Sequence, residues 1–135
     1  GARIAVAGLA PGLLAVAEAG RLEQILVNLL RNGLDAMAGL PDPVLDVTAG
    51  REGNNVCITV RDRGPGLSDD ARSHLFEAFY TTKPAGEGLG LGLAISLTIA
   101  ESYGGTLSAR NAPEGGAVFV LCLPASGEQD AAPDA

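Results

Sequence analysis

The sequence contains no tryptophan, one methionine and one histidine, and its aromatic residues are two tyrosines and three phenylalanines. Long apolar runs are also missing: no stretch approaches the roughly 20 residues that span a bilayer, and no signal peptide is visible. We therefore expect no membrane contact by this domain. Basic residues are also scarce. The chain has nine Lys and Arg and sixteen Asp and Glu, which gives a net charge of −7. This balance argues against a nucleic-acid partner, which requires a basic face.

Cysteine is equally rare. The two cysteines, Cys57 and Cys122, both lie in strand-like apolar runs. Isolated thiols in core strands are most often buried apolar groups in a reducing compartment. We interpret them in that way, although the sequence leaves a disulfide open. The chain begins at Gly1 and not at methionine, so we expect a piece of a longer protein.

The apolar pattern predicts a single domain over residues 1–124, followed by a disordered acidic tail over residues 125–135. Helical spacing predicts helices over residues 21–37 and 91–103. Alternation between turn signals predicts strands over residues 3–9, 13–16, 44–48, 56–61, 106–111 and 117–123. Residues 63–90 have little apolar periodicity, and a loop of this length predicts a functional lid. The fold class expected is α/β (α+β): a two-layer sandwich in which a mixed, mostly antiparallel five-stranded sheet packs on about three helices.

Two asparagines mark the first predicted helix. Asn28 and Asn32 lie four residues apart, about 5–6 Å at Cβ on one helix face, and with Asp35 they form a polar stripe beside the apolar one. A solvated helix face is the alternative interpretation. Amide oxygens are hard, neutral ligands that suit a divalent cation already neutralised by phosphates.

The segment Asp62-Arg63-Gly64-Pro65-Gly66 closes a predicted strand. An ordinary turn is the alternative, since Asp before Gly is common in turns. As a binding element, a carboxylate beside the tight turn formed by Gly64 and Gly66 could accept a hydrogen bond from an amino group.

A glycine-rich segment, Gly86-Glu87-Gly88-Leu89-Gly90-Leu91-Gly92-Leu93, precedes the second predicted helix. It matches neither a P-loop nor the dinucleotide fingerprint. Free backbone N–H groups at a helix start nevertheless favour phosphate binding. Lys83 is the nearest cation for terminal phosphates, and a solvated lid lysine is its alternative interpretation.

These three elements, in this order, resemble the N box and the two glycine boxes of the ATP-binding catalytic domain of two-component sensor histidine kinases. This is the GHKL, or HATPase, family with the Bergerat fold. Residues 75–83 resemble its F box, in which Phe76 and Phe79 would anchor the lid on apolar surface. Residues 81–92 look most like nitrogen-regulation and dicarboxylate sensors. The resemblance implies ATP and Mg²⁺ as cofactors, with Asn32 on the metal, Asn28 on phosphate or the solvent around the ion, and Asp62 on the exocyclic amine of adenine. The other nucleotide-binding residues that it implies are Gly64, Gly66, Lys83, Gly88, Leu89, Gly90, Leu91 and Gly92.

The sequence departs from the family pattern at two places. Gly115-Gly116-Ala117 replaces the usual Gly-Thr near the last strand, and Asp35 stands where many members carry lysine. The single histidine, His74, is followed by Leu75-Phe76 and lacks the acidic neighbour of a phosphoacceptor histidine, so no catalytic residue is expected within this chain.

The function that the resemblance implies is that of a protein histidine kinase: the domain presents the γ-phosphate of Mg-ATP to a histidine on a separate dimerisation domain of a homodimer, with a response regulator downstream. The location implied is the cytoplasm, alone or as part of a membrane-bound sensor. The alternatives are a hydrolytic ATPase of the same fold and a nucleotide-binding module without kinase activity. Asn28 argues against hydrolysis, because hydrolytic relatives carry a general-base glutamate there.

Overall fold

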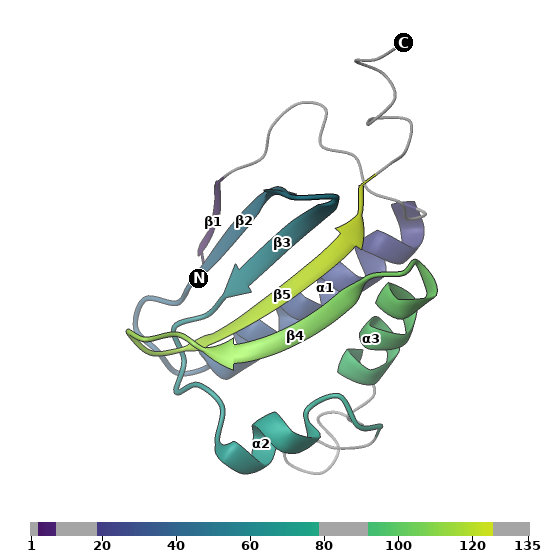
Figure 1. Ribbon diagram of the computed structural model, residues 1–135. Helices are drawn as coiled ribbons and strands as arrows, with labels where there is room; N and C mark the ends of the chain where they lie inside the picture. The colour runs from purple at the N-terminus through teal and green to yellow at the C-terminus, as the bar shows by residue number, and fades with distance from the viewer. Residues whose placement is uncertain (1–2, 8–18, 79–91, 126–135) are drawn as a thin grey trace.

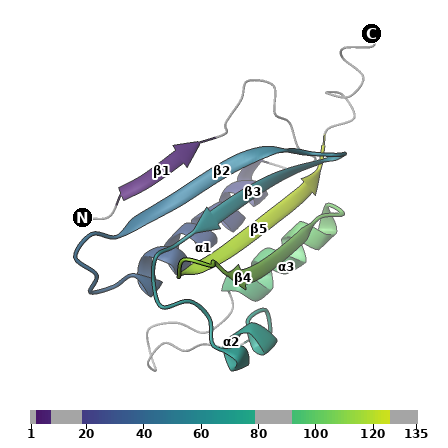
Figure 2. The same ribbon diagram turned by 60° about the vertical axis from the view of Figure 1, so that its left-hand side comes forward.

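A sheet and its helices form two layers in the computed structural model of the chain (Figure 1), which describes residues 3–7, 19–78 and 92–125. The strands are β1 (Arg3–Ala7), β2 (Val44–Glu52), β3 (Asn55–Arg61), β4 (Thr106–Asn111) and β5 (Ala117–Pro124). The helices are α1 (Ala19–Ala36), α2 (Asp69–His74) and α3 (Gly92–Ser102). Figures 1 and 2 show α1 and α3 on one face of the sheet, with α2 beyond one end of it.

The strand order across the sheet is β1-β2-β3-β5-β4. The four strands β2, β3, β5 and β4 pair antiparallel, and β1 pairs parallel with β2 at the edge. The predicted two-layer α+β sandwich with a mostly antiparallel sheet on about three helices is confirmed. Because β5 inserts between β3 and β4, the end of β3 at Arg61 lies opposite Val118, the second residue of β5. This register brings the segment after β3 beside the segment before β5.

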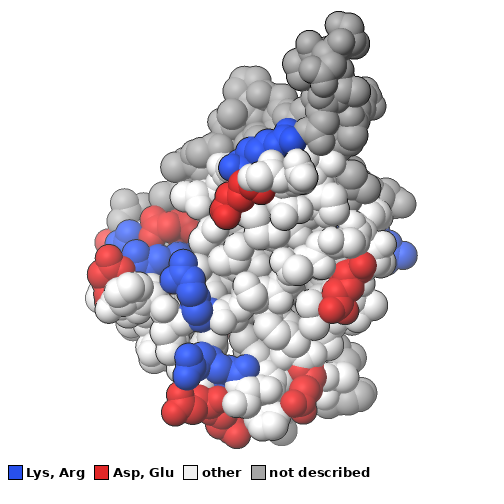
Figure 3. Space-filling view, in the orientation of Figure 1, with Lys and Arg blue, Asp and Glu red and all other residues white. Residues whose placement is uncertain are grey.

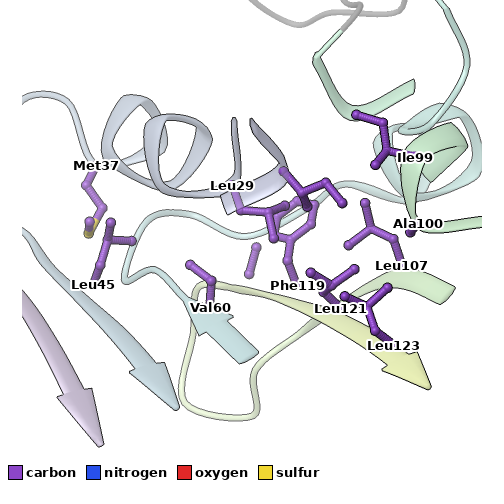
Figure 4. Packing of buried hydrophobic residues seen from close by; sticks show 12 residues of the cluster. Leu29, Met37, Leu45, Val60, Ile99, Ala100, Leu107, Phe119, Leu121 and Leu123 are labelled. Carbon is purple, nitrogen blue, oxygen red and sulfur yellow. The ribbon is translucent and has the colours of Figure 1, made fainter. Parts of the chain in front are cut away.

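The core fills the space between the helices and the sheet (Figure 4). Ile25 and Leu29 of α1, and Met37 directly after it, are buried at the spacing that predicted an amphipathic helix. They meet the buried strand residues Leu45, Val60, Leu107, Phe119, Leu121 and Leu123. Each large side chain removed from water in this way contributes about 1.5–3 kcal/mol. None of the helices in the described residues combines the length and apolarity needed to cross a membrane.

The ends of α1 and α3 lie within two residues of the predicted ones, and two larger differences occur elsewhere. β2 continues to Glu52, because the ladder persists through the pairs of Gly50 with Cys57 and Glu52 with Asn55, so the hairpin turn is shorter than predicted. The lid predicted over residues 63–90 as a loop contains α2, which is a correction. The predicted strand over residues 13–16, Phe79 and residues 126–135 lie outside the described residues, so the domain boundary at residue 124 stays a prediction.

The interpretation of the cysteines as unpaired thiols is wrong. Cys57 and Cys122 are joined by a disulfide, with Cα atoms 4.1 Å apart and a sequence separation of 65 residues. The cause is register, because the antiparallel pairing of β3 with β5 places these two residues directly opposite each other. The sequence alone does not give the register between β3 and β5, so it could not show that the two cysteines face each other.

We expect reduction of this bond to lower the free energy of unfolding by about 2–4 kcal/mol, since it closes a long loop of the unfolded chain. Equilibrium urea unfolding with and without a thiol reductant measures the change. The double variant Cys57→Ser/Cys122→Ser is the control and should not respond to reductant. Two alkylatable thiols in the native, unreduced protein would contradict the bond.

Candidate functional site

A pocket of about 310 Å³ opens between α1, the segment after β3, and α2. This volume is that of a small-molecule site, for which about 300 Å³ is the lower end. Its lining comes from four parts of the chain: Asn32, Asp35 and Ala36 of α1; Asp62 and residues 65–68 after β3; Ala71 and Leu75; and Ala117 at the start of β5. The structure thus brings together Asn32, Asp62 and Gly66, which the sequence predicted as one site from separate motifs.

Asp62 is one of two buried polar residues among those described, the other being Ser96. Its Oδ1 accepts hydrogen bonds from the backbone N–H of Gly64 at 2.9 Å and of Ala117 at 3.2 Å. Its own N–H donates to the carbonyl of Ala117 at 3.0 Å. No described residue donates to Oδ2, so this oxygen is the acceptor that Asp62 offers to a ligand in the pocket.

Two glycines permit this arrangement. A Cβ on Gly64 would lie 2.6 Å from the carbonyl oxygen of Ala36, so only glycine lets the turn approach α1. Gly116 has a φ of +89°, and a Cβ there would collide with the carbonyl oxygen of Asp62. The departure at Gly115-Gly116-Ala117 therefore has a local role: Gly116 allows the close approach, and Ala117 supplies one N–H to the carboxylate.

Asn111, at the end of β4, is a residue of the site that the sequence did not indicate. Its Oδ1 accepts from the N–H of Leu67 at 2.6 Å, and its Nδ2 donates to the carbonyl of Leu67 at 3.0 Å. This pair of bonds anchors the pocket wall that follows Gly66 on the sheet. A single asparagine at a strand end has no distinctive pattern, so only the structure reveals this role.

Helix α2 forms another part of the wall that the sequence analysis missed. Ser68 caps it, with Oγ accepting from the N–H of Ala71 at 3.0 Å, and Asp69 and Asp70 occupy its first turn. Ser-Asp-Asp is a helix-start signal, because a serine cap and acidic residues both stabilise free N–H groups. Phe76 packs against the core as predicted for a lid anchor.

Asn28 lies on α1, at the other end of the site, and contacts the first turn of α3. Its Nδ2 donates to the carbonyl of Gly92 at 3.3 Å and to Oγ of Ser96 at 3.1 Å. Two predicted site residues, Asn28 and Gly92, are therefore in contact. The remaining predicted phosphate-binding residues lie outside the described residues: Lys83, Gly88, Leu89, Gly90 and Leu91.

The donor set fits a metal held mainly by amides and ligand oxygens. Residues 3–7, 19–78 and 92–125 contain no group of three or more His, Cys, Asp and Glu side chains that could hold a metal ion. Mg²⁺ is usually bound through one or two protein groups plus substrate phosphates. Asn32 lines the pocket and Asn28 lies beside the first turn of α3, and their amide oxygens are of the ligand type that suits such an ion.

The surface charges in the view of Figure 3 form small groups of both signs and no basic stripe. Arg63 pairs with Asp46 at 3.1 Å, and Arg61 with Glu114 at 3.6 Å. A phosphate-bearing ligand would thus depend on local dipoles and a cation and not on a broad positive field.

His74 ends α2 and is partly exposed. Its Nδ1 lies 2.7 Å from Oε2 of Glu77, and its Nε2 lies 3.7 Å from Oδ1 of Asp70. The hydrogen bond to Glu77, with the charge of that carboxylate, raises the pKa of His74 above 6.5, and Asp70 adds to the effect.

Comparisons with a family model and with known proteins all match this chain to histidine kinases and related ATPases. A family model described as "Histidine kinase-, DNA gyrase B-, and HSP90-like ATPase" matches residues 17–127. The C4-dicarboxylate transport sensor protein DctB of Pseudomonas aeruginosa is 50% identical over 104 residues, covering 76% of this chain and 17% of that protein. The sensor protein DctS of Rhodobacter capsulatus is 44% identical over 126 residues, covering 90% of this chain and 19% of that protein. The predicted likeness to dicarboxylate sensors is confirmed, and the chain spans about a fifth of the length of these relatives.

Solved structures agree. The catalytic domain of histidine kinase ThkA superposes with a TM-score of 0.81 at 27% identity, covering 95% of this chain and 82% of that one. Full-length ShkA in complex with AMPPNP superposes with a TM-score of 0.77 at 35% identity, covering 93% of this chain and 26% of that one.

The pair formed by His74 and Glu77 yields a pH prediction. Because the pKa is raised in the folded state, the stabilising contribution is fully present below the unfolded pKa and is lost as the pH rises through the folded pKa. Proton NMR of the one imidazole should give a titration midpoint above 6.5. Glu77→Gln should lower this midpoint, and Asp70→Asn should lower it less. A midpoint that Glu77→Gln leaves unchanged would contradict the assigned cause.

Proposed function

We propose, from the premise that this chain belongs to the family of histidine kinase-, DNA gyrase B- and HSP90-like ATPases, that it binds Mg-ATP and presents the γ-phosphate to a histidine on another domain. The observation that carries the proposal is the buried carboxylate of Asp62, held by two backbone N–H groups with its second oxygen left for a ligand.

This geometry supports adenine as the base. Adenine carries an exocyclic amine that donates to Oδ2 of Asp62, whereas guanine carries a carbonyl oxygen in that place, which a carboxylate repels. Gly64 and Gly66 shape the turn beside the ring, and Asn111 holds the wall through Leu67. A buried carboxylate that cannot rotate away is a strong discriminator, because its two backbone bonds fix its plane.

The phosphate end of the nucleotide is assigned to the start of α3. We infer that Asn32 supplies an amide oxygen to Mg²⁺ and that the N–H groups around Gly88, Leu89, Gly90, Leu91 and Gly92 receive the phosphates, with Lys83 as the local cation. The metal, when bound, neutralises phosphate charge. The chain's own residues position the nucleotide and exclude water, which are the contributions that phosphoryl transfer demands.

Transfer is favoured over hydrolysis by Asn28. A residue one helical turn before Asn32 is well placed to act on water, yet an amide cannot take up a proton. Asn28 also has its amide nitrogen engaged by Gly92 and Ser96. The acceptor is then a histidine outside this chain, and His74, held by Glu77 on α2, does not serve as one.

The partners follow as proposals. We assign the acceptor histidine to the dimerisation domain of the parent protein, acting in a homodimer on the cytoplasmic side, with a response regulator downstream. The support is that curated relatives are sensor proteins several times longer than this chain.

Asp62→Asn tests base recognition. Asparagine retains an oxygen for the N–H groups of Gly64 and Ala117 but replaces Oδ2 by a donor, which faces the donor of adenine. Hydrogen bonds to a charged group contribute about 1.5–3 kcal/mol, so ATP and ADP affinity should fall about 10- to 100-fold. Calorimetry measures the ATP and ADP affinities, and Asp46→Asn, the same change at a surface aspartate, is the matched control. Unchanged ADP affinity would remove Asp62 from the site.

A second experiment separates transfer from hydrolysis. The chain alone should bind ATP, hydrolyse it very slowly and not label itself. Mixed with the helical acceptor domain of its parent, it should yield an acid-labile, base-stable phosphoprotein labelled on histidine. Brisk magnesium-dependent ATP turnover by the chain alone, or label on His74, would refute the assignment.

A further inference from the structure

Ser96 is the one buried polar side chain, besides Asp62, among the described residues, and it is 0% exposed. A buried hydroxyl is costly unless it makes hydrogen bonds. Alanine would fill nearly the same space in α3 without that cost. The partner of the Ser96 hydroxyl is the amide nitrogen of Asn28, at 3.1 Å. The hydroxyl is therefore explained by what it does for Asn28.

The contact fixes which way the Asn28 amide faces. A backbone carbonyl can only accept a hydrogen bond, so the Asn28 atom that lies 3.3 Å from the carbonyl oxygen of Gly92 must be the nitrogen. The same nitrogen donates to Ser96, four residues further along α3. Both N–H groups of the amide are thus engaged by one turn of α3, and no described residue donates to Oδ1.

The Asn28 side chain therefore has both N–H donors engaged by α3, whereas its oxygen Oδ1 can still accept a hydrogen bond or bind a cation. It cannot donate to a phosphate oxygen, and its own oxygen would be repelled by one. The same oxygen suits a divalent cation or the hydrogens of water bound to it. The family resemblance left two roles for Asn28, phosphate or the solvent around the ion, and the hydrogen-bond geometry selects the second.

We propose that Ser96 is a positioning residue for the nucleotide site: with the carbonyl of Gly92, it binds the amide nitrogen of Asn28 and so turns Oδ1 toward the cation and its bound water. This proposal rests on the proposed function, because it requires a metal-nucleotide ligand. It assigns to α3 a second role beside that of its backbone N–H groups, namely setting the orientation of a side chain on α1.

The test is Ser96→Ala, compared with Ser102→Ala, which makes the same change at the other end of α3 where the hydroxyl bonds only its own helix at Ile99. Calorimetry with a non-hydrolysable ATP analogue should show affinity in Mg²⁺ lowered about 3- to 10-fold in Ser96→Ala, from the loss of one neutral hydrogen bond. Affinity for ADP in EDTA should not change. Ser102→Ala should match the parent chain in both conditions.

A double-mutant cycle adds a readout that a structural role would not give. Asn28→Ala should lower the Mg²⁺-dependent affinity by itself, and Ser96→Ala should then have no further effect. In ¹H–¹⁵N spectra of the free protein, Ser96→Ala should shift the side-chain amide of Asn28 and speed its solvent exchange. Equal losses with and without Mg²⁺, unchanged affinity in both conditions, or full additivity with Asn28→Ala would overturn the positioning role.

The outcomes also separate this inference from the proposed function. If Ser96→Ala leaves nucleotide affinity unchanged while Asp62→Asn lowers ADP affinity as expected, the nucleotide site stands and the role of Ser96 is refuted. If ADP does not bind the parent chain at all, the proposed function fails, and the proposal for Ser96 fails with it.

Discussion

The carboxylate of Asp62 is the constraint on which the site depends. It follows β3, lies under α1 and accepts from the N–H groups of Gly64 and Ala117, so it joins the turn after β3 to the start of β5. That connection exists because β5 inserts between β3 and β4 and places Arg61 opposite Val118. The burial that would make an isolated carboxylate costly is offset by these two bonds, and the remaining oxygen is the one that we propose accepts a hydrogen bond from the ligand.

Helix α1 connects the two ends of the site. The buried side chains of Ile25 and Leu29 pack it on the sheet, while Asn28 and Asn32 lie on the adjoining face. Four residues correspond to about 6 Å along a helix. Asn32 lines the pocket that contains Asp62, and Asn28 contacts the first turn of α3. The proposed site thus runs along α1 from the pocket that contains Asp62 to the start of α3 at Gly92.

The elements that the sequence predicted well are those set by local periodicity. Helix α1, helix α3 and the closing hairpin follow from apolar spacing, and Asp62 with its glycines follows from a motif that is continuous in the chain. The elements missed depend on pairing between distant segments. The disulfide needs the β3–β5 register, Asn111 reaches Leu67 across 44 residues, and Ser96 reaches Asn28 across 68. Helix α2 was not predicted for a different reason: its six residues are too few to show helical periodicity, and its one local signal is the start Ser68-Asp69-Asp70.

The most direct test of the account is a crystal structure of the chain with Mg²⁺ and a non-hydrolysable ATP analogue. We expect the exocyclic amine of adenine within hydrogen-bond distance of Oδ2 of Asp62, with Gly64 and Ala117 still donating to Oδ1. An adenine bound elsewhere, or an Asp62 carboxylate that leaves Gly64 and Ala117 when the nucleotide binds, would contradict the claim that this carboxylate reads the base.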